Sequence, residues 1–525
     1  MERCIMKILA AVFDVSTGKP HENAAKMINI MRENDADIYL FPAYCLTGAS
    51  AGKLVNYQAF ADQTNEALDS LLEYSENENK IFVTAVAGYE NIIVKDGELI
   101  QKASTTISGK RVVVSQPGDD GNADIILLPT AMAGYPCIQN DIIEFCSEAS
   151  NSKNCAIAVA NAGFGESSAD NVYKGFAGVF NKGIICSFKN QDDPDNAIAC
   201  YDIDIPGGLI YSRPNRGLDR IPYFGKNEPE RYLDELFKLQ TQALYMRMRG
   251  SGIKKIVIGV SGGSDSTLAL LCAEKTMQML GLPLTNIIAV TMPCFGTSTR
   301  TKSNADMLME KLGVTSMTVD IKNAVTAHLK DIGHDPEIQD VTYENAQARE
   351  RTQVLFDIAN MNNALVLGTG DMSEAALGFC TFGGDNLAHY NPNASIPKTL
   401  VLELIKHIAK TKDEAIAGVL TDITNTPISP ELKAGQETEK IVGNYALHDF
   451  YIYFFAKMQK SYEEIKNLAL AVFEDIDEDE IVACLDTFYD RFKKNRFKRS
   501  TVFEGANLIG FTLPYIAADI DFDLK

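Results

Sequence analysis

The sequence is poor in the features that mark several large classes of protein. No apolar run reaches the roughly 20 residues of a membrane-spanning helix, and no low-complexity tract interrupts the chain. Basic residues are outnumbered, with 49 lysines and arginines against 70 aspartates and glutamates, which gives a formal net charge of −21. So acidic a chain is a poor candidate for binding a nucleic-acid backbone or an anionic membrane. We therefore expect no nucleic-acid partner and no membrane partner.

Patterns of metal binding and disulfide bonding are also missing. The 11 cysteines include no Cys-x-x-Cys pair, and the six histidines include no His-x-x-x-His pair. These absences argue against a zinc site and against a common metal-hydrolase motif. The scattered cysteines, and an N-terminus without the long apolar segment of a signal peptide, predict free thiols and a cytoplasmic location.

The composition does support large folded domains. With 525 residues, 46% of them hydrophobic, two or three domains are expected. In the first half, short apolar strands alternate with helical patterns, which predicts a layered α/β architecture. The expected elements are strands at 6–13, 37–42, 80–86, 111–114, 125–129 and 156–160, a helix at 21–33 and a hairpin turn at 95–98. A connector rich in Pro and Gly, followed by helical periodicity, places a domain boundary near residue 228.

The most informative stretch begins at Lys255. The run Ile256–Val260 predicts a buried parallel strand, Ser261-Gly-Gly-Ser-Asp-Ser266 a loop, and 267–280 a helix. In this order, backbone N–H groups converge on a phosphate at the positive end of the helix, and the glycines allow close approach. The loop matches neither the Walker nor the GxGxxG pattern. It resembles the Ser-Gly-Gly-x-Asp-Ser loop of the ATP pyrophosphatases, and the alternative is an ordinary strand-to-helix turn.

A second strand, loop and helix follow at Ala364–Glu374. The strand ends in Gly-Thr369-Gly, and Ser373-Glu374 opens the helix. The Thr369 hydroxyl is placed to meet ATP and the Glu374 carboxylate to hold Mg²⁺, although Ser373 and Glu374 would equally suit a plain helix cap. In a doubly wound parallel sheet the two loops end neighbouring strands, so Asp265 and Glu374 are expected to flank one metal site.

Three further segments carry a family resemblance. Met292-Pro293 with its Ser/Thr-rich loop, Glu344–Arg351 and Gly378–Thr399 resemble segments of the two-domain, glutamine-dependent bacterial NAD synthetases. Phe382 and His389 stand where the small ammonia-dependent enzymes carry Lys and Asp. The resemblance continues to about residue 515, so residues 229–525 are expected to form an NAD synthetase domain with a doubly wound ATP-pyrophosphatase fold.

The resemblance implies an enzyme that adenylates deamido-NAD with ATP and then amidates it. It assigns catalysis to Asp265 and Lys398 and Mg²⁺ to Asp265 and Glu374. It assigns ATP binding to Gly259, Ser261, Gly262, Gly263, Ser264, Asp265, Ser266, Met292, Thr369 and Lys398. It assigns substrate binding to Asn345, Arg349, Glu374, Phe379, Thr381, Phe382 and Lys498. The residue types alone leave plainer alternatives: a surface charge for Arg349, core packing for Phe379 and Phe382, and a solvated helix face for Lys498.

The first half resembles the nitrilase-type amidase domain of the same family over roughly residues 5–205. Phe41–Gly48 is similar to that family's Phe-Pro-Glu-Leu-x-Leu-Thr-Gly motif, and Gly163–Val172 is similar to a later one. The family's catalytic Glu position is Ala43 here, no lysine segment matches, and residues 115–121 contain no cysteine. Cys137 suits a small core residue better than a nucleophile. Residues 1–228 are therefore expected to form a nitrilase-like α-β-β-α sandwich without glutaminase activity.

Several functions stay open at this point. The first is an NAD synthetase that takes ammonia from solution or from a separate glutaminase. The second is a glutamine-dependent enzyme that works through a partner or an atypical nucleophile. The third is an inactive scaffold or regulatory homologue, and a weaker fourth is another adenylating enzyme, such as one that modifies tRNA. The family resemblance also implies a homo-oligomer.

Overall fold

The computed structural model describes residues 6–101, 104–114, 122–191, 195–211, 217–224, 228–296, 299–429, 432–433, 438–501 and 504–517. The chain forms two compact units, Met1–Pro214 and Asn215–Lys525. The expected boundary near residue 228 coincides with the start of helix α4 (Pro229–Ser251) rather than with this division. The position of the boundary between independently folding domains therefore stays a prediction. None of the described helices combines the length and apolarity that a membrane crossing needs.

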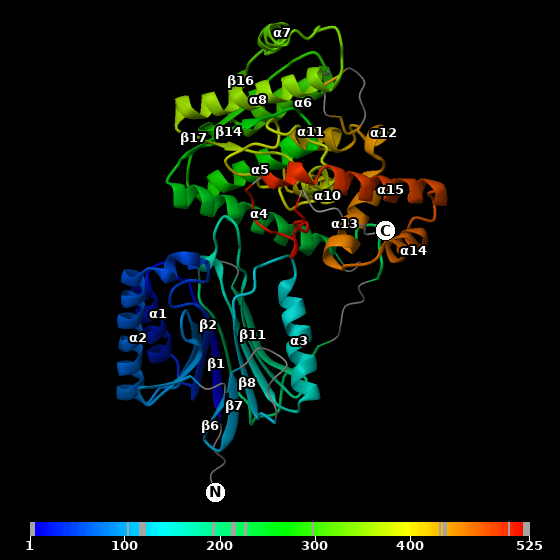
Figure 1. Ribbon diagram of the computed structural model, residues 1–525. Helices are drawn as coiled ribbons and strands as arrows, with labels where there is room; N and C mark the ends of the chain where they lie inside the picture. The colour runs from blue at the N-terminus through cyan, green and yellow to red at the C-terminus, as the bar shows by residue number, and fades with distance from the viewer. Residues whose placement is uncertain are drawn as a thin grey trace. The chain divides into compact units, whose positions relative to one another are not determined.

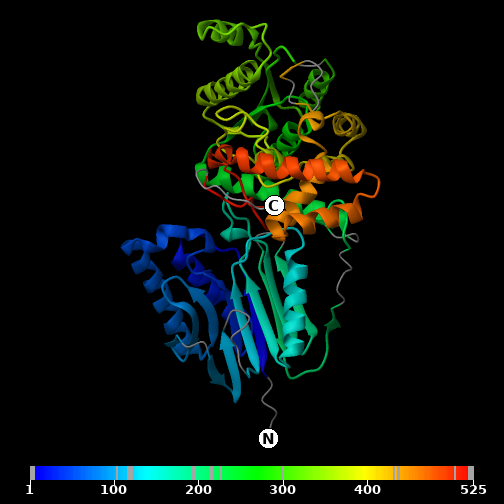
Figure 2. The ribbon, with the colours of Figure 1, turned by 45° about the vertical axis from the view of Figure 1, so that its right-hand side comes forward.

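The first unit is a four-layer sandwich. Two β-sheets pack face to face through a shared apolar core. Helices α1 (Pro20–Glu33) and α2 (Gln58–Glu78) cover the outer face of one sheet. Helix α3 (Ile138–Ser152) covers the outer face of the other (Figure 1, Figure 2). This arrangement confirms the α-β-β-α sandwich that the sequence predicted.

Among the described residues, the two sheets of this unit contain six and seven strands. The first runs β12 (Ala197–Asp202), β1 (Lys7–Val12), β2 (Ile38–Ala43), β3 (Phe82–Val86), β4 (Glu90–Lys95), β5 (Glu98–Ile100). The second runs β13 (Leu209–Ile210), β11 (Ile184–Gln191), β10 (Gly175–Asn181), β9 (Ala156–Asn161), β8 (Ile125–Thr130), β7 (Lys110–Val114), β6 (Ser104–Ile107). Short helical turns occur at η1 (Ala49–Asn56) and η2 (Phe164–Glu166).

Strand β1 shows why the strands of this unit appear as apolar runs in the sequence. Ile8 and Val12 point into the core between the sheets. Leu9 and Phe13 point the other way and pack against the helices that cover the sheet. Because successive residues of a strand face opposite sides, a strand buried on both faces is apolar at every position. The expected strands are accordingly present, with ends shifted by one or two residues.

The second unit is built on a four-stranded parallel sheet. Its order is β16 (Thr315–Thr318), β15 (Ile287–Thr291), β14 (Lys255–Gly259), β17 (Ala364–Leu367). Helix α8 (Val341–Asn362) lies on one face of the sheet and α5 (Ser264–Met279) on the other (Figure 1). This confirms the doubly wound fold. All four strands end at the same edge, and β14 and β17 are direct neighbours there.

Many further helices surround this sheet. They are α6 (Thr299–Leu312), α7 (Lys322–Asp331), α9 (Met372–Leu377), α10 (Lys398–Ala409), α11 (Glu414–Thr424), α12 (Glu439–Val442), α13 (Tyr445–Ile452), α14 (Tyr462–Val472) and α15 (Glu478–Lys494). Short helical turns lie at η3 (Leu284–Asn286), η4 (Tyr453–Lys457) and η5 (Arg496–Thr501).

One predicted boundary is wrong in a way that affects the site. Helix α5 begins at Ser264, not at Thr267, so Ser264, Asp265 and Ser266 form its first turn. Ser and Asp are common both in turns and in the first turn of a helix, so the sequence does not separate the two.

Candidate functional site

The first loop, residues 260–263, joins β14 to α5. The strand is buried, with no exposed surface on Ile256 or Ile258. Gly262 has a φ of 89°, a left-handed conformation that favours glycine. Gly263 is the N-cap residue, and no side chain caps the helix. The positive end of α5 is therefore open to a bound anion, as a phosphate site requires.

Two serines hold this loop in shape. Ser261 Oγ accepts the N–H of Gly263 at 3.1 Å, and Ser266 Oγ accepts the N–H of Ser261 at 3.3 Å. The Ser266 hydroxyl also lies 3.2 Å from the carbonyl oxygen of Gly263 and donates to it. These two hydroxyls thus contact only the first loop and the first turn of α5 among the hydrogen bonds described above. That they also bind ATP stays a prediction.

The second loop, residues 368–371, joins β17 to α9. Asp371 is the N-cap residue: its Oδ1 accepts the N–H of Glu374 at 2.8 Å, and Glu374 Oε2 accepts the N–H of Asp371 at 3.3 Å. This reciprocal pair is a capping box. The sequence pattern pointed to Ser373 and Glu374 at this helix start, but Asp371 was not predicted. The Asp-x-x-Glu spacing was the signal that could have identified it.

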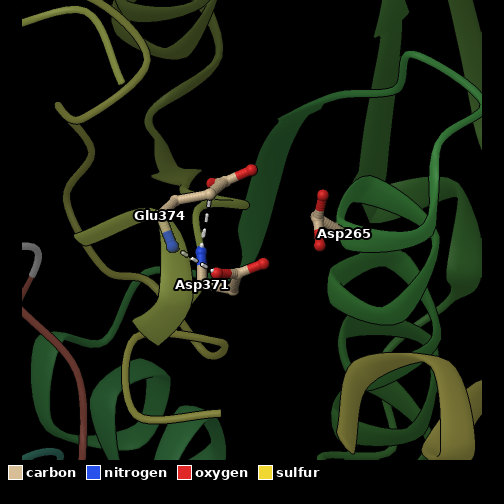
Figure 3. Close-up of side chains that lie close together, drawn as sticks. All are labelled: Asp265, Asp371 and Glu374. Atoms are coloured by element: carbon tan, nitrogen blue, oxygen red, sulfur yellow. Dashed lines mark hydrogen bonds between the residues drawn. The ribbon is translucent and has the colours of Figure 1, made fainter. Parts of the chain in front are cut away.

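Three carboxylates from these two loops meet around one ammonium group. The Nζ atom of Lys398, a fully buried side chain at the start of α10, lies 2.6 Å from Asp265 Oδ2 and 2.6 Å from Asp371 Oδ2. It lies 3.2 Å from Glu374 Oε1. Figure 3 shows the Asp265 carboxylate, on α5, facing those of Asp371 and Glu374. We refer to Asp265, Asp371 and Glu374 as the carboxylate cluster.

One ammonium group does not balance three carboxylates. Burial raises the pKa of Glu374 to about 7, and it raises the pKa of Asp371 well above its ordinary value. In both cases Lys398 opposes the rise, while the neighbouring carboxylates add to it. Burial alone would lower the pKa of Lys398, but the three carboxylates together raise it well above its ordinary value. The cluster therefore favours a further positive charge.

The carboxylate cluster fits a divalent cation. One oxygen from each of its three residues lies within 4.8 Å of the others. Asp265 Oδ1 accepts no hydrogen bond from any residue that the structure describes, and Asp371 Oδ2 forms an ion pair with Lys398. Carboxylate oxygens are the ligands that Mg²⁺ prefers. The sequence predicted two of these three residues for Mg²⁺.

Asp449 on α13 ties together the starts of α9 and α10. Its carboxylate accepts hydrogen bonds from the Ser373 hydroxyl and, at 2.7 Å, from the N–H of Thr399. Ser373 Oγ in turn accepts the N–H of Lys398 at 2.9 Å. Burial raises the pKa of Asp449 to about 6. No role was predicted for Asp449, because no short motif links it to residues so far away in the chain.

A cavity of about 540 Å³ opens beside the carboxylate cluster. Ten of the predicted site residues line it: Gly259, Ser261, Gly263, Ser264, Asp265, Ser266, Met292, Thr369, Glu374 and Phe379. Arg351 and Asp385 line it too and were not predicted as site residues. Arg351 Nε donates to the carbonyl of Met292 at 3.4 Å, and Asp385 Oδ1 accepts the N–H of Thr381 at 2.6 Å.

Other predicted substrate residues gather around the segment 378–385, next to the cavity rather than in its lining. Thr381 Oγ1 donates to Asn345 Oδ1 at 2.8 Å, and Arg349 donates to the carbonyl of Phe382 at 3.2 Å. Lys498 Nζ donates to the carbonyls of Gly378 and Cys380 at 2.7 Å each. Lys498 is therefore not a residue of a solvated helix face. Substrate contact by this group remains a prediction.

In the first unit, the position expected for the general base of an amidase is occupied by alanine. Ala43, at the end of β2, is a buried residue without an ionisable group, and the segment 115–121 lies outside the described residues. Burial raises the pKa of the Cys186 thiol to about 11, and it also raises the pKa of Cys45 and Cys146 above the ordinary value. A nucleophilic cysteine needs a lowered pKa. Cys137 is the buried N-cap residue of α3, consistent with a core position.

Glu166 is a buried residue of this unit whose carboxylate has a structural role. Its Oε1 accepts the N–H of Ala49 at 3.1 Å, and its Oε2 accepts the N–H of Gly163 at 3.0 Å. It thereby joins the segments that follow β2 and β9. Burial raises its pKa to about 7, although both hydrogen bonds lower it.

Comparison with known proteins points to one family. Residues 237–501 match the family model described as NAD synthase. A glutamine-dependent NAD(+) synthetase of Mycobacterium leprae is 43% identical over 254 residues, which cover 45% of this chain and 37% of that protein. An NH(3)-dependent NAD(+) synthetase of Chlorobium phaeobacteroides is 31% identical over 263 residues, which cover 49% of this chain and 83% of that protein.

The likeness of fold extends further along the chain. The crystal structure of a glutamine-dependent NAD(+) synthetase from Cytophaga hutchinsonii aligns over 96% of this chain and 95% of its own, with a TM-score of 0.71. At 15% identity, this comparison concerns the fold alone. The chain spans less than two-fifths of the length of the Mycobacterium leprae protein that it matches in sequence.

Proposed function

The chain belongs to the NAD synthase family, and we propose that it forms NAD by ATP-dependent amidation of deamido-NAD. In this reaction an oxygen of the nicotinate carboxylate forms a bond to the α-phosphorus of ATP, and the bond to the pyrophosphate breaks. Ammonia then attacks the carbonyl carbon of the NAD-adenylate, AMP leaves and a proton is released. The protein would thus be a ligase that forms a C–N bond.

One observation carries this proposal. The open N-terminus of α5, the carboxylate cluster and Lys398 lie together beside one cavity, at the edge where parallel strands β14 and β17 end. An anion site next to a cation site is what a metal-bound triphosphate requires. Ligands of open parallel sheets bind at this edge.

The roles of the residues follow from their positions. The first loop and the first turn of α5 would hold the phosphates through backbone N–H groups. Mg²⁺ held by Asp265, Asp371 and Glu374 would supply positive charge to the phosphate oxygens. Lys398 adds a fixed ammonium group, because its contacts with Asp265 and Asp371 and the bond from its N–H to Ser373 hold it in place. Positioning and charge stabilisation of this kind carry most of the catalysis in phosphate chemistry.

Deamido-NAD would bind on the side of the cavity that Phe379 lines. Asn345, Arg349, Thr381, Phe382 and Lys498 surround the segment that carries Phe379, so we assign them to the substrate as a group. The half-exposed ring of Phe382 packs against Phe497, with ring centres 6.0 Å apart, and offers an apolar surface.

We further propose ammonia as the direct nitrogen donor. Ala43 supplies no general base, and the Cys45, Cys146 and Cys186 thiols have raised pKa values. The second candidate is a glutamine-dependent enzyme, which the similarity to the glutamine-dependent NAD(+) synthetase of Mycobacterium leprae favours. A separate glutaminase and a homo-oligomer remain predictions.

The nitrogen donor decides between these candidates. Purified protein is supplied with ATP, Mg²⁺ and deamido-NAD, and either ammonium or glutamine, and NAD is measured. We expect NAD with ammonium, and a rate with glutamine lower by about three orders of magnitude, the usual effect of losing a member of a catalytic set. Adding an unrelated active glutaminase should restore NAD formation from glutamine. Equal rates with both donors would refute the loss of glutaminase activity, and no NAD with either donor would refute NAD synthesis.

A further inference from the structure

Two buried asparagines lie directly behind the carboxylate cluster. Asn391 and Asn393 have no exposed surface, and both belong to the segment between β17 and α10. Buried amide groups are costly unless their hydrogen-bonding groups have partners. The NH₂ groups of these two amides donate to backbone carbonyls of the first turn of α5 and of the second loop.

Asn393 connects the two loops through one amide group. Its Nδ2 donates to the carbonyl of Asp265 at 2.9 Å and to the carbonyl of Thr369 at 3.1 Å. Asp265 is in the first turn of α5, and Thr369 is in the second loop. A single NH₂ group thus spans the ends of β14 and β17, and both of its hydrogens are used.

Asn393 is itself held from two sides. Gln240 of α4, also fully buried, donates from Nε2 to Asn393 Oδ1 at 2.8 Å. Asn391 Oδ1 accepts the N–H of Asn393 at 3.0 Å, and Asn391 Nδ2 donates to the carbonyl of Gly370 at 2.7 Å. The amide has little freedom to rotate, so its two donors stay at a fixed distance.

We propose that Asn393 is a positioning residue, which sets the distance between Asp265 in the first turn of α5 and Thr369 in the loop that leads into α9 and Glu374. Asn391 and Gln240 support it. This inference rests on the proposed function where it concerns ATP, because those loops are the proposed site of the triphosphate. The effect on loop mobility is independent of that function.

The test compares two buried asparagines. Asn393→Ala removes the connection, and Asn161→Ala in the first unit is the matched control. Asn161 is also fully buried, and its Nδ2 donates to the carbonyls of Met132 and Lys174 at 3.2 Å each. Hydrogen–deuterium exchange without ligands should rise about tenfold in residues 261–268 and 368–376 of Asn393→Ala, as expected for loss of one or two hydrogen bonds. These segments should not change in Asn161→Ala.

Kinetics with ammonium provide the second measurement. For Asn393→Ala we expect kcat/KM for ATP to fall about 100-fold, the effect of a displacement of about 1 Å in a site, while KM for deamido-NAD changes little. If Asn393→Ala does not fold, Gln240→Met, which leaves Asn393 Oδ1 without its donor, should show the same changes at smaller size. Unchanged exchange in both segments would overturn the inference. An inactive wild type would instead overturn the proposed function, and the exchange data would still decide the role of Asn393.

Discussion

The two units both bury carboxylates near the ends of parallel strands, but the carboxylates differ in what their oxygen atoms contact. In the first unit, both oxygens of Glu166 accept backbone N–H groups. In the second, Asp265 Oδ1 has no hydrogen-bond donor among the described residues, and Asp265 lines a cavity. Burial raises the pKa of Glu166 and of Glu374 to about 7 alike. A raised pKa therefore does not identify a ligand site; unsatisfied oxygens beside a cavity do.

The units also differ in how negative charge is balanced. Glu166 is stabilised by backbone dipoles alone, whereas the carboxylate cluster surrounds the ammonium group of Lys398. Glu166 joins two segments of the chain, whereas the carboxylate cluster with Lys398 still favours a further cation. Three substitutions test this contrast.

The largest effect is expected for Asp265→Ala. It removes a proposed cation ligand and the partner of Lys398, so NAD formation from ammonium should fall by three orders of magnitude or more. The protein should still fold, because one of three mutually repelling carboxylates is lost. Asp357→Ala, at an exposed position of α8, is the control and should retain full activity. Turnover close to that of the wild type in Asp265→Ala would contradict the assignment of the site.

The next effect concerns stability. Lys398→Met leaves the carboxylate cluster without its buried counter-charge, which should destabilise the second unit by about 3 kcal/mol at pH 7. Urea unfolding followed by circular dichroism measures this loss. Lys406→Met, on the same helix but in an exposed pair with Glu403, should cost less than about 1 kcal/mol. An equal loss of unfolding free energy in the two variants would show that the buried ammonium group is not needed for stability.

The smallest effect is a dependence on pH in the first unit. Because the pKa of Glu166 is raised from 4.5 to about 7, the folded state holds this proton more tightly than the unfolded state. Stability should therefore fall as pH rises from about 4.5 to 7, by roughly 3 kcal/mol. Glu166→Gln should abolish this fall, at the cost of one accepted hydrogen bond.

Native-state hydrogen exchange of β2 and β9 across this pH range provides the measurement, since the chain has no tryptophan. Glu73→Gln, at an exposed position of α2, should behave like the wild type. The same pH profile in all three proteins would mean that folding does not raise the pKa of Glu166.

The sequence predicted the features that depend on neighbouring residues. Buried strands such as β1 are apolar on both faces, from Ile8 to Val12, and the loops after β14 and β17 carry their glycines and acids within a few residues. Asp371 was missed although its capping pattern is local. Asp449 and Asn393 could not be found in this way, because they act on Ser373 and Asp265 across 76 and 128 residues of chain. The packing of the fold brings such pairs together, and no local pattern encodes them.

The buried position of Lys398 has a consequence for how tightly the site binds cations. An ammonium group fixed to the backbone is present at a very high effective concentration and never diffuses away. A metal ion that binds here would share Asp265 and Asp371 with the Lys398 ammonium group. This competition would lower the affinity of the site for the ion. In the proposed reaction, Lys398 would continue to neutralise these carboxylates whenever no cation is bound.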